Sequence, residues 1–105
     1  MIQKTPCTLE LQESLEDTGK FRITGILNFD SIIALDRRAR DLFQKYNKII
    51  VDLTGVTYVN SAGLALLLEW KRQTLLDNKT FQLLGVPQKL LNIAHMTEIE
   101  SILSV

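Results

Sequence analysis

Two apolar segments separated by a short gap constrain the fold of this chain more than any other feature of the sequence. Residues 48–53 form an apolar run of strand length with a carboxylate, Asp52, near its end, which predicts a buried strand. Residues 61–76 are long enough for a helix, and the hydroxyl of Ser61 stands where a helix cap is expected. We expect residues 54–59, between the two segments, to form a loop. A buried strand followed by such a helix is typical of an α/β protein.

The first quarter of the chain predicts a β-hairpin. Apolar and polar side chains alternate in residues 8–12 and again in residues 20–24, so each segment has one face suited to a core and one suited to water. Residues 14–19 between them are mostly polar and end in glycine. We therefore expect residues 14–19 to form the connecting turn.

Two helices and one more strand are predicted in the rest of the chain. Residues 30–46 space their apolar side chains along one face of a helix, and Asp30 with Ser31 is the expected cap of that helix. Near the end of the chain, residues 80–85 predict a strand. Pro87 is suited to the first position of a last helix, because its missing N–H would have no partner there.

The predicted elements follow the order ββαβαβα. Strand–helix–strand units of this size pair their strands in parallel through right-handed crossovers, whereas the opening hairpin pairs its strands antiparallel. We therefore expect an α/β fold, a mixed β-sheet with helices packed on it, formed by a single domain of residues 1–105.

Composition narrows the classes of partner. The 12 basic and 12 acidic side chains leave no net charge, so nucleic acid and anionic membrane surfaces are not expected as partners. The longest apolar stretch, residues 62–68, is far shorter than the ~20 residues that cross a bilayer. Cys7 has no second cysteine to pair with, and residues 1–6 lack the apolar core of a signal peptide. We expect a cytoplasmic protein that contacts a membrane only through a partner complex.

The position of Ser61 allows two interpretations. The start of a helix offers free N–H groups and the positive end of the helix dipole, which favour a phosphate. The hydroxyl of Ser61 can therefore be a modifiable switch that faces a partner. Alternatively, it only caps the helix. The sequence leaves both interpretations open.

Catalysis by Ser61 is not expected. The residues around it do not form the glycine-flanked elbow of a serine nucleophile, and the only histidine, His95, lies in the last predicted helix. Asp52 has the position of a receiver-domain aspartate, but the acidic pair that would hold magnesium is missing. We expect Asp52 to accept N–H bonds from the loop that begins at Thr54, supporting the geometry in front of Ser61. Neither a metal-ligand set nor a phosphate loop is present, so no cofactor is expected.

A cluster of three arginines, Arg37, Arg38 and Arg40, could bind a phosphate. Two acidic residues, Asp36 and Asp41, each stand four positions from one of these arginines. This is the spacing of ion pairs on a solvated helix face, and we favour that interpretation.

The helix expected at residues 61–76 is more apolar than its place on a sheet requires. Residues 62–68 are small or apolar in every direction around the axis, although one apolar stripe would be enough. Leu64, Leu67 and Leu68 have the spacing of the sheet-facing side. The remaining apolar surface either packs against neighbouring helices or forms a partner patch beside Ser61.

The segment from Val51 to Leu64, with the apolar helix that follows it, resembles the signature of STAS domains. This family is shared by anti-sigma factor antagonists and by small regulatory subunits of transporters, and the similarity extends over roughly residues 20–95. The resemblance implies that Ser61 is the switch residue, with Asn60 as its neighbour. It also implies a supporting role for the strand-end carboxylate.

Two positions depart from the antagonist pattern Asp-Ser-[Ser/Thr/Ala]-Gly-Leu-Gly, because Asn60 replaces the aspartate and Ala65 replaces the second glycine. Residues 63–68 are similar instead to the helix of MlaB-like STAS subunits of the Mla phospholipid-transport ABC system. In those subunits a hydroxyl residue at the position of Ser61 contacts the ATPase.

The resemblance therefore implies a non-enzymatic regulatory subunit that docks on the ATPase subunit, at the inner face of the inner membrane. Its expected partner-binding residues are Asn60, Ser61, Ala62, Gly63, Leu64 and Ala65, supported by Asp52 and Thr54. The alternative is an anti-sigma factor antagonist, which captures a serine kinase when Ser61 is unmodified.

Overall fold

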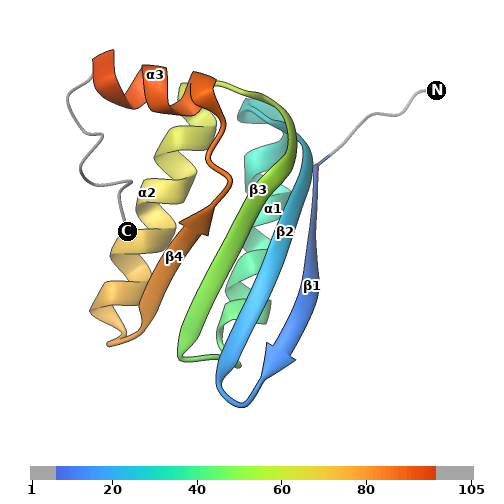
Figure 1. The fold of residues 1–105 in the computed structure, drawn as a ribbon, viewed down its shortest axis with the longest axis vertical. Coiled ribbons are helices and arrows are strands. Elements are labelled where there is room, and N and C mark those ends of the chain that lie inside the picture. The colour runs from blue at the N-terminus through green and yellow to red at the C-terminus, as the bar shows by residue number, and fades with distance from the viewer. Residues whose placement is uncertain (1–6, 97–105) are drawn as a thin grey trace.

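The computed structural model describes residues 7–96, with side chains as far as Ala94. Its elements are β1 (Cys7–Leu15), β2 (Thr18–Leu27), α1 (Phe29–Phe43), β3 (Lys48–Val59), α2 (Ser61–Leu76), β4 (Thr80–Leu84) and α3 (Gln88–Met96). The strands form one sheet in the order β1-β2-β3-β4, where β1 and β2 pair antiparallel and the other neighbours pair in parallel (Figure 1). The predicted mixed α/β fold is confirmed.

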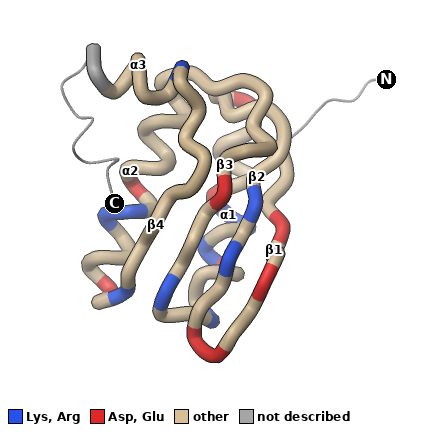
Figure 2. The backbone as a smooth tube through the Cα atoms, in the orientation of Figure 1, with Lys and Arg blue, Asp and Glu red and all other residues tan. Residues whose placement is uncertain are grey.

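Both long helices lie on the same face of this sheet. The two crossovers, β2-α1-β3 and β3-α2-β4, step in the same direction across the sheet, so right-handed connections bring α1 and α2 to one side (Figure 1). α3 crosses the end of α2 at which α2 begins. No described helix covers the opposite face of the sheet (Figure 1). Charged residues occur along β1 and β2 (Figure 2).

A chain of aromatic rings joins the sheet to both long helices. The Phe21 ring of β2 meets the Phe43 ring of α1 edge-on with centroids 5.1 Å apart, and Phe43 meets the Trp70 ring of α2 in the same way at 5.2 Å. All three side chains are buried. Edge-to-face pairs add roughly 0.5–1.5 kcal/mol each beyond their buried area. These contacts hold the two-layer packing together.

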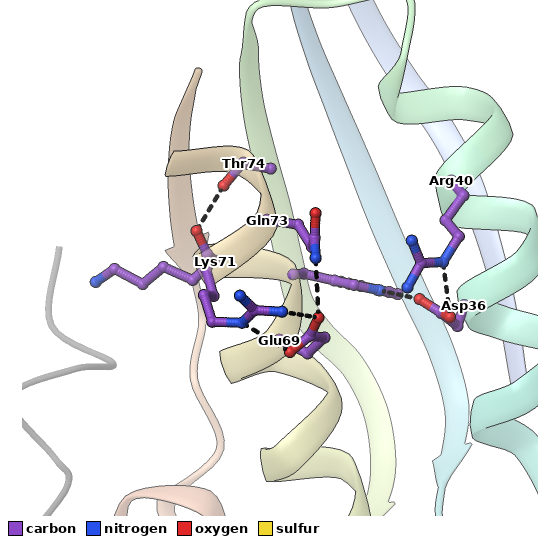
Figure 3. Close-up of polar contacts among 8 residues, drawn as sticks. Asp36, Arg40, Glu69, Lys71, Gln73 and Thr74 are labelled. Atoms are coloured by element: carbon purple, nitrogen blue, oxygen red, sulfur yellow. Dashed lines mark hydrogen bonds and ion pairs between the residues drawn. The ribbon is translucent and has the colours of Figure 1, made fainter. Parts of the chain in front are cut away.

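A polar contact between the helices accompanies these rings. The indole Nε1–H of Trp70 donates to Asp36 Oδ1 at 2.8 Å, and Arg40 Nε donates to Asp36 Oδ2 at 3.0 Å (Figure 3). The carboxylate therefore satisfies the one polar group of a buried tryptophan.

Most of the apolar run in α2 is buried inside the protein. Leu64 and Leu67 are 4% and 1% exposed, and Leu68 packs partly buried against the core. Ala65, in contrast, is exposed. Packing against the sheet and the neighbouring helices, the first of the two interpretations left open above, accounts for most of this surface.

The predicted cap of α1 was wrong. The cap is Asn28, whose Oδ1 accepts the N–H groups of Asp30 at 3.0 Å and Ser31 at 3.2 Å. The Ser31 hydroxyl accepts the Asn28 N–H at 3.0 Å in return, which completes a capping box. Asn28, Asp30 and Ser31 are all of residue types that can cap a helix. Asn28 takes this role because it directly follows Leu27, where β2 ends.

The predicted loop at residues 54–59 was also wrong, because β3 continues to Val59. Its pairing with β2 is interrupted between Arg22 and Thr24 and again between Gly25 and Ile26, so the segment lacks a regular alternation of apolar residues. The hairpin turn is shorter than predicted, since β1 and β2 leave only residues 16–17 between them.

β2 ends three residues later than predicted and α1 ends at Phe43, three residues earlier than predicted, whereas the next two boundaries differ by one residue. β4 ends at Leu84, and the helix over 88–96 begins just after Pro87, whose carbonyl accepts the N–H groups of Leu90 and Leu91. None of the helices in residues 7–96 has the length and hydrophobicity needed to cross a lipid bilayer.

We predict that Leu67→Ala destabilises the protein by about 2–5 kcal/mol, because it removes a side chain that is 1% exposed from the sheet-facing side of α2. Leu75→Ala is the matched control in the same helix, since Leu75 is 56% exposed, and its cost should stay within about 0.5 kcal/mol. Urea unfolding at pH 7 measures both. Equal costs for the two variants would contradict this core assignment.

Candidate functional site

The carboxyl ends of β2 and β3 bring the starts of both long helices together. Leu27 and Val59 are register partners, and the Asn60 N–H donates to the Leu27 carbonyl at 3.3 Å. Asn28 and Asn60, the next residues, cap α1 and α2. The first residues of the two helices, Phe29 and Ser61, therefore follow directly from neighbouring strand ends at one edge of the sheet (Figure 1).

Asn60, not Ser61, caps α2. The Asn60 side chain accepts the Ala62 N–H at 2.9 Å, and its carbonyl accepts the N–H groups of Gly63 and Leu64 at 3.0 and 3.2 Å. Ser61 is the first helical residue and is exposed. Within the described residues its hydroxyl makes no hydrogen bond. The interpretation of Ser61 as only a cap is therefore wrong.

Gly63 allows α2 to begin close against the strand ends. A Cβ at this position would lie 2.7 Å from Val59 Cγ2 and 3.0 Å from Leu27 Cβ, closer than side chains approach one another. The Leu27 carbonyl oxygen would be 3.2 Å away. A glycine is therefore required here by close packing.

Only part of the predicted partner-binding set reaches the surface. Ser61 and Ala65 are exposed, and Asn60 is half-buried. Ala62, Gly63 and Leu64 are buried, with Ala62 and Leu64 each 4% exposed. The sequence does not separate these two groups, because all of these residues lie within a turn and a half of one helix. Because Ala62, Gly63 and Leu64 are buried, they support the surface residues and do not present side chains to a partner.

Asp52 lies on the uncovered face of the sheet. Its Oδ1 accepts the Thr54 N–H at 2.9 Å, which confirms the expected bond, and its Oδ2 accepts from Arg22 Nη2 at 3.0 Å and Nε at 3.3 Å. Arg22 was missed by the sequence analysis, although its alternating strand position was a signal. β3 runs roughly 20 Å further before Ser61. Asp52 therefore holds the irregular pairing opposite Arg22 and does not border Ser61.

These contacts lower the pKa of the Asp52 carboxyl below its ordinary value. The largest cause is the N–H bond from Thr54, because a donated hydrogen bond favours the charged form. Arg22 lowers the pKa further through its hydrogen bond and its positive charge, and burial of Asp52 opposes both effects. The carboxylate is therefore ionised at neutral pH and serves as a structural anchor.

The three arginines of α1 do not converge on one ligand. Arg40 pairs with Asp36 at 3.0 Å, as its spacing predicted. Arg38 donates to the Leu9 carbonyl at 2.7 Å, at the edge of the sheet. Arg37 has no ion pair or hydrogen bond with any described residue, so the predicted pair with Asp41 does not form.

Groups with catalytic potential are not assembled around Ser61 in the described part of the chain. The side chain of His95, the one base considered above, lies outside the described residues. Burial raises the pKa of the Cys7 thiol to about 11, so the thiol stays protonated at neutral pH. No group of three or more described histidine, cysteine, aspartate or glutamate residues could hold a metal ion.

Two exposed apolar residues near this edge were missed by the sequence analysis. Phe29 is 71% exposed and Ile33 is 66% exposed, and both lie in the first turns of α1. Their spacing of four residues on a helix whose core face lies elsewhere was a signal for them.

A family model described as "Mlab, STAS domain" matches residues 10–104. None of the curated proteins matches the sequence.

Solved structures share the fold at low sequence identity. The anti-sigma factor antagonist SpoIIAA in its unphosphorylated form superposes with a TM-score of 0.69 at 17% identity, over 90% of this chain and 84% of that chain. The Bacillus cell fate determinant SpoIIAA in its phosphorylated form also gives 0.69 at 17% identity, over 90% and 86%. An anti-sigma factor antagonist from Mycobacterium paratuberculosis gives 0.73 at 16% identity, over 93% and 83%.

We predict that Asn60→Ala costs about 0.5–2 kcal/mol of stability, because the Ala62 N–H loses its acceptor. Ser61→Ala should change stability by less than about 0.5 kcal/mol, since its hydroxyl bonds nothing in the described structure. Asn60→Asp is the control that keeps the cap. Urea unfolding of the four proteins at pH 7 compares them, and a larger cost for Ser61→Ala than for Asn60→Ala would return the capping role to Ser61.

Asp52 should make stability depend on pH. Its pKa is lower in the folded state, so the unfolded chain binds more protons between the two pKa values. The stabilisation is complete above about pH 5 and is lost as the pH falls through the folded pKa. Asp52→Asn keeps an acceptor for Thr54 without titrating. When the pH is lowered from 7 to about 2, the free energy of unfolding should therefore fall more for the parent than for Asp52→Asn. A pH-independent difference between them would contradict this assignment.

Proposed function

The chain belongs to the STAS domain family, and on this basis we propose that it is a non-catalytic regulatory subunit that docks on the ATPase of a phospholipid-transport ABC system. Binding through the surface around Ser61, where α2 begins, would support assembly or activity of that ATPase. The protein would then act in the cytoplasm, held at the inner membrane through its partner.

The observation that carries this proposal is the exposed Ser61 hydroxyl, which makes no hydrogen bond with any described residue. Asn60 supplies the cap of α2, so a serine is not required there for the helix to form. A polar group presented at a helix start, without a bond inside the protein, is available to a partner or to a modifying enzyme.

The surface around Ser61 suits close contact with another protein. Ser61, Ala65 and Leu68 stand at positions i, i+4 and i+7 of α2, so they line one stripe of the helix. Ala65 is exposed and small, and Leu68 is half-buried. A small residue between a hydroxyl and a leucine lets a partner approach the helix backbone closely.

The match to the Mlab family model agrees with the resemblance to MlaB-like subunits, and that resemblance implies an ATPase as the partner. The replacement of the antagonists' second glycine by Ala65 agrees with it. An alternative function is supported by the shared fold of SpoIIAA, which is named an anti-sigma factor antagonist and has a phosphorylated form. In that case the partner is a serine kinase, and a phosphate on Ser61 would meet the N–H groups of the first helical turn.

We predict that Ser61→Asp binds the purified ATPase subunit at least tenfold more weakly, because the added charge must lose its water against a surface that met a neutral hydroxyl. Its stability should change by less than about 1 kcal/mol, since a negative charge in the first helical turn is favourable. Ser61→Thr should bind like the parent. Ser61→Asn is the neutral control of matching size, and it should bind more tightly than Ser61→Asp.

Calorimetric titration and thermal unfolding of the same four proteins test this prediction. If Ser61→Asp binds as tightly as the parent, the partner docks elsewhere and the site assignment is wrong. If the parent does not bind the ATPase at all, the transporter function is wrong, and the same series should be titrated with an anti-sigma factor serine kinase.

A further inference from the structure

We propose that the partner also inserts a large apolar side chain, flanked by a carboxylate, into a groove between α1 and α2. This proposal rests on the proposed function, because it extends the Ser61 surface to a second contact region on α1. The groove has a volume of about 290 Å³, and its lining residues are Ile32, Ile33, Asp36, Arg37, Arg40 and Leu66. We call it the α1–α2 groove.

An exposed apolar pair on α1 includes one residue of the α1–α2 groove, Ile33. Phe29 and Ile33 lie one turn apart on α1 and are 71% and 66% exposed. Scattered single hydrophobic residues on a surface need no explanation, but here Ile33 lines a concavity and Phe29 precedes it by one turn on the same helix. Their burial by a partner would be favourable, because it would remove apolar surface from water. Such a pair is suited to a docking surface.

The interior of the groove suits one side chain. Leu66, 7% exposed, reaches it from α2, and half-buried Ile32 reaches it from α1. Pockets that enclose whole small molecules have volumes of about 300–1,000 Å³. A groove at the lower limit of that range is better suited to an aliphatic or aromatic side chain that projects from a partner's surface.

The positive charge of Arg37 at the rim of the groove favours a carboxylate on the partner. Figure 3 shows Arg40 directed at Asp36, and the Asp36 carboxylate also accepts the Trp70 indole, so both charged groups of this pair are engaged. Arg37 lines the same groove without a partner among the described residues. A guanidinium in this position can donate two hydrogen bonds to one carboxylate. The partner segment should therefore carry Asp or Glu beside its apolar residue.

The α1–α2 groove and the Ser61 surface share the helix α2. α1 and α2 begin side by side, because the Leu27 and Val59 strand ends are paired. Leu66, which lines the groove, directly follows the exposed Ala65 in α2. One partner can therefore contact the start of α2 and occupy the groove at the same time.

Substitution of the exposed apolar pair tests the proposal directly. Phe29→Ala/Ile33→Ala should bind the purified ATPase subunit at least tenfold more weakly without a lower melting temperature. The matched control is Leu15→Ala/Leu75→Ala, which removes two leucines that are 74% and 56% exposed elsewhere. The control should bind like the parent. If the parent binds the ATPase and the Phe29/Ile33 variant binds equally well, this inference is wrong while the proposed function stands.

Charge reversal at the rim tests the predicted carboxylate. Arg37→Glu should weaken binding at least threefold and reduce its dependence on salt concentration, because an attraction is replaced by a repulsion. Lys45→Glu reverses an exposed charge beyond the end of α1 and is the matched control. Equal effects of the two reversals would overturn the carboxylate, since they would report only the net charge of the protein.

Selection from a random peptide library separates the inference from the choice of ATPase. Peptides displayed on phage are selected on the parent protein and counter-selected on Phe29→Ala/Ile33→Ala. The expected clones carry a large apolar residue close to Asp or Glu, and Arg37→Glu should weaken their binding. If no clones depend on Phe29 and Ile33, or if their flanking residues are basic, the inference is overturned even where the ATPase fails to bind.

Discussion

Parallel pairing of β2 with β3 is the constraint on which the rest of this structure depends. Parallel neighbours cannot be joined by a tight turn, so α1 must cross between them, and their carboxyl ends must meet at one edge of the sheet. Because Leu27 and Val59 are partners at that edge, both long helices begin there. The aromatic contact from Phe21 through Phe43 to Trp70 then holds both helices against the same face.

In this arrangement, the residues that stabilise the start of α2 differ from those that are exposed to a partner. Asn60 caps α2, and Gly63 lets the helix approach the strand ends closely. Ser61 makes no hydrogen bond within the described residues. In the proposed complex, a charge added to it would meet favourable N–H groups inside the protein and an unfavourable partner surface outside it. Such a position can change binding strongly while it changes stability little, which is what a regulatory contact requires.

Polar interactions on the two sides of the sheet have different consequences. On the uncovered side, Arg22 and Thr54 hold the ionised Asp52 carboxylate and secure the irregular pairing of β3. On the helical side, Asp36 joins Trp70 and Arg40 and thereby keeps α1 next to α2. Asp36 and Arg40 also line the α1–α2 groove. Because they pair with each other, Arg37 is the lining cation that has no partner among the described residues.

The sequence by itself determined the order of elements, the mixed sheet, and the bounds of α2, because hydrophobic periodicity is a local property that survives in each segment. It also carried the STAS signature and the bond from Thr54 to Asp52. Only the tertiary structure decided that Asn60 caps α2, that β3 runs through the expected loop, and that Ala62 is buried beside the exposed Ser61. These features depend on the register between strands and on which elements pack against one another. Register and packing are not encoded in the spacing of residues along one segment.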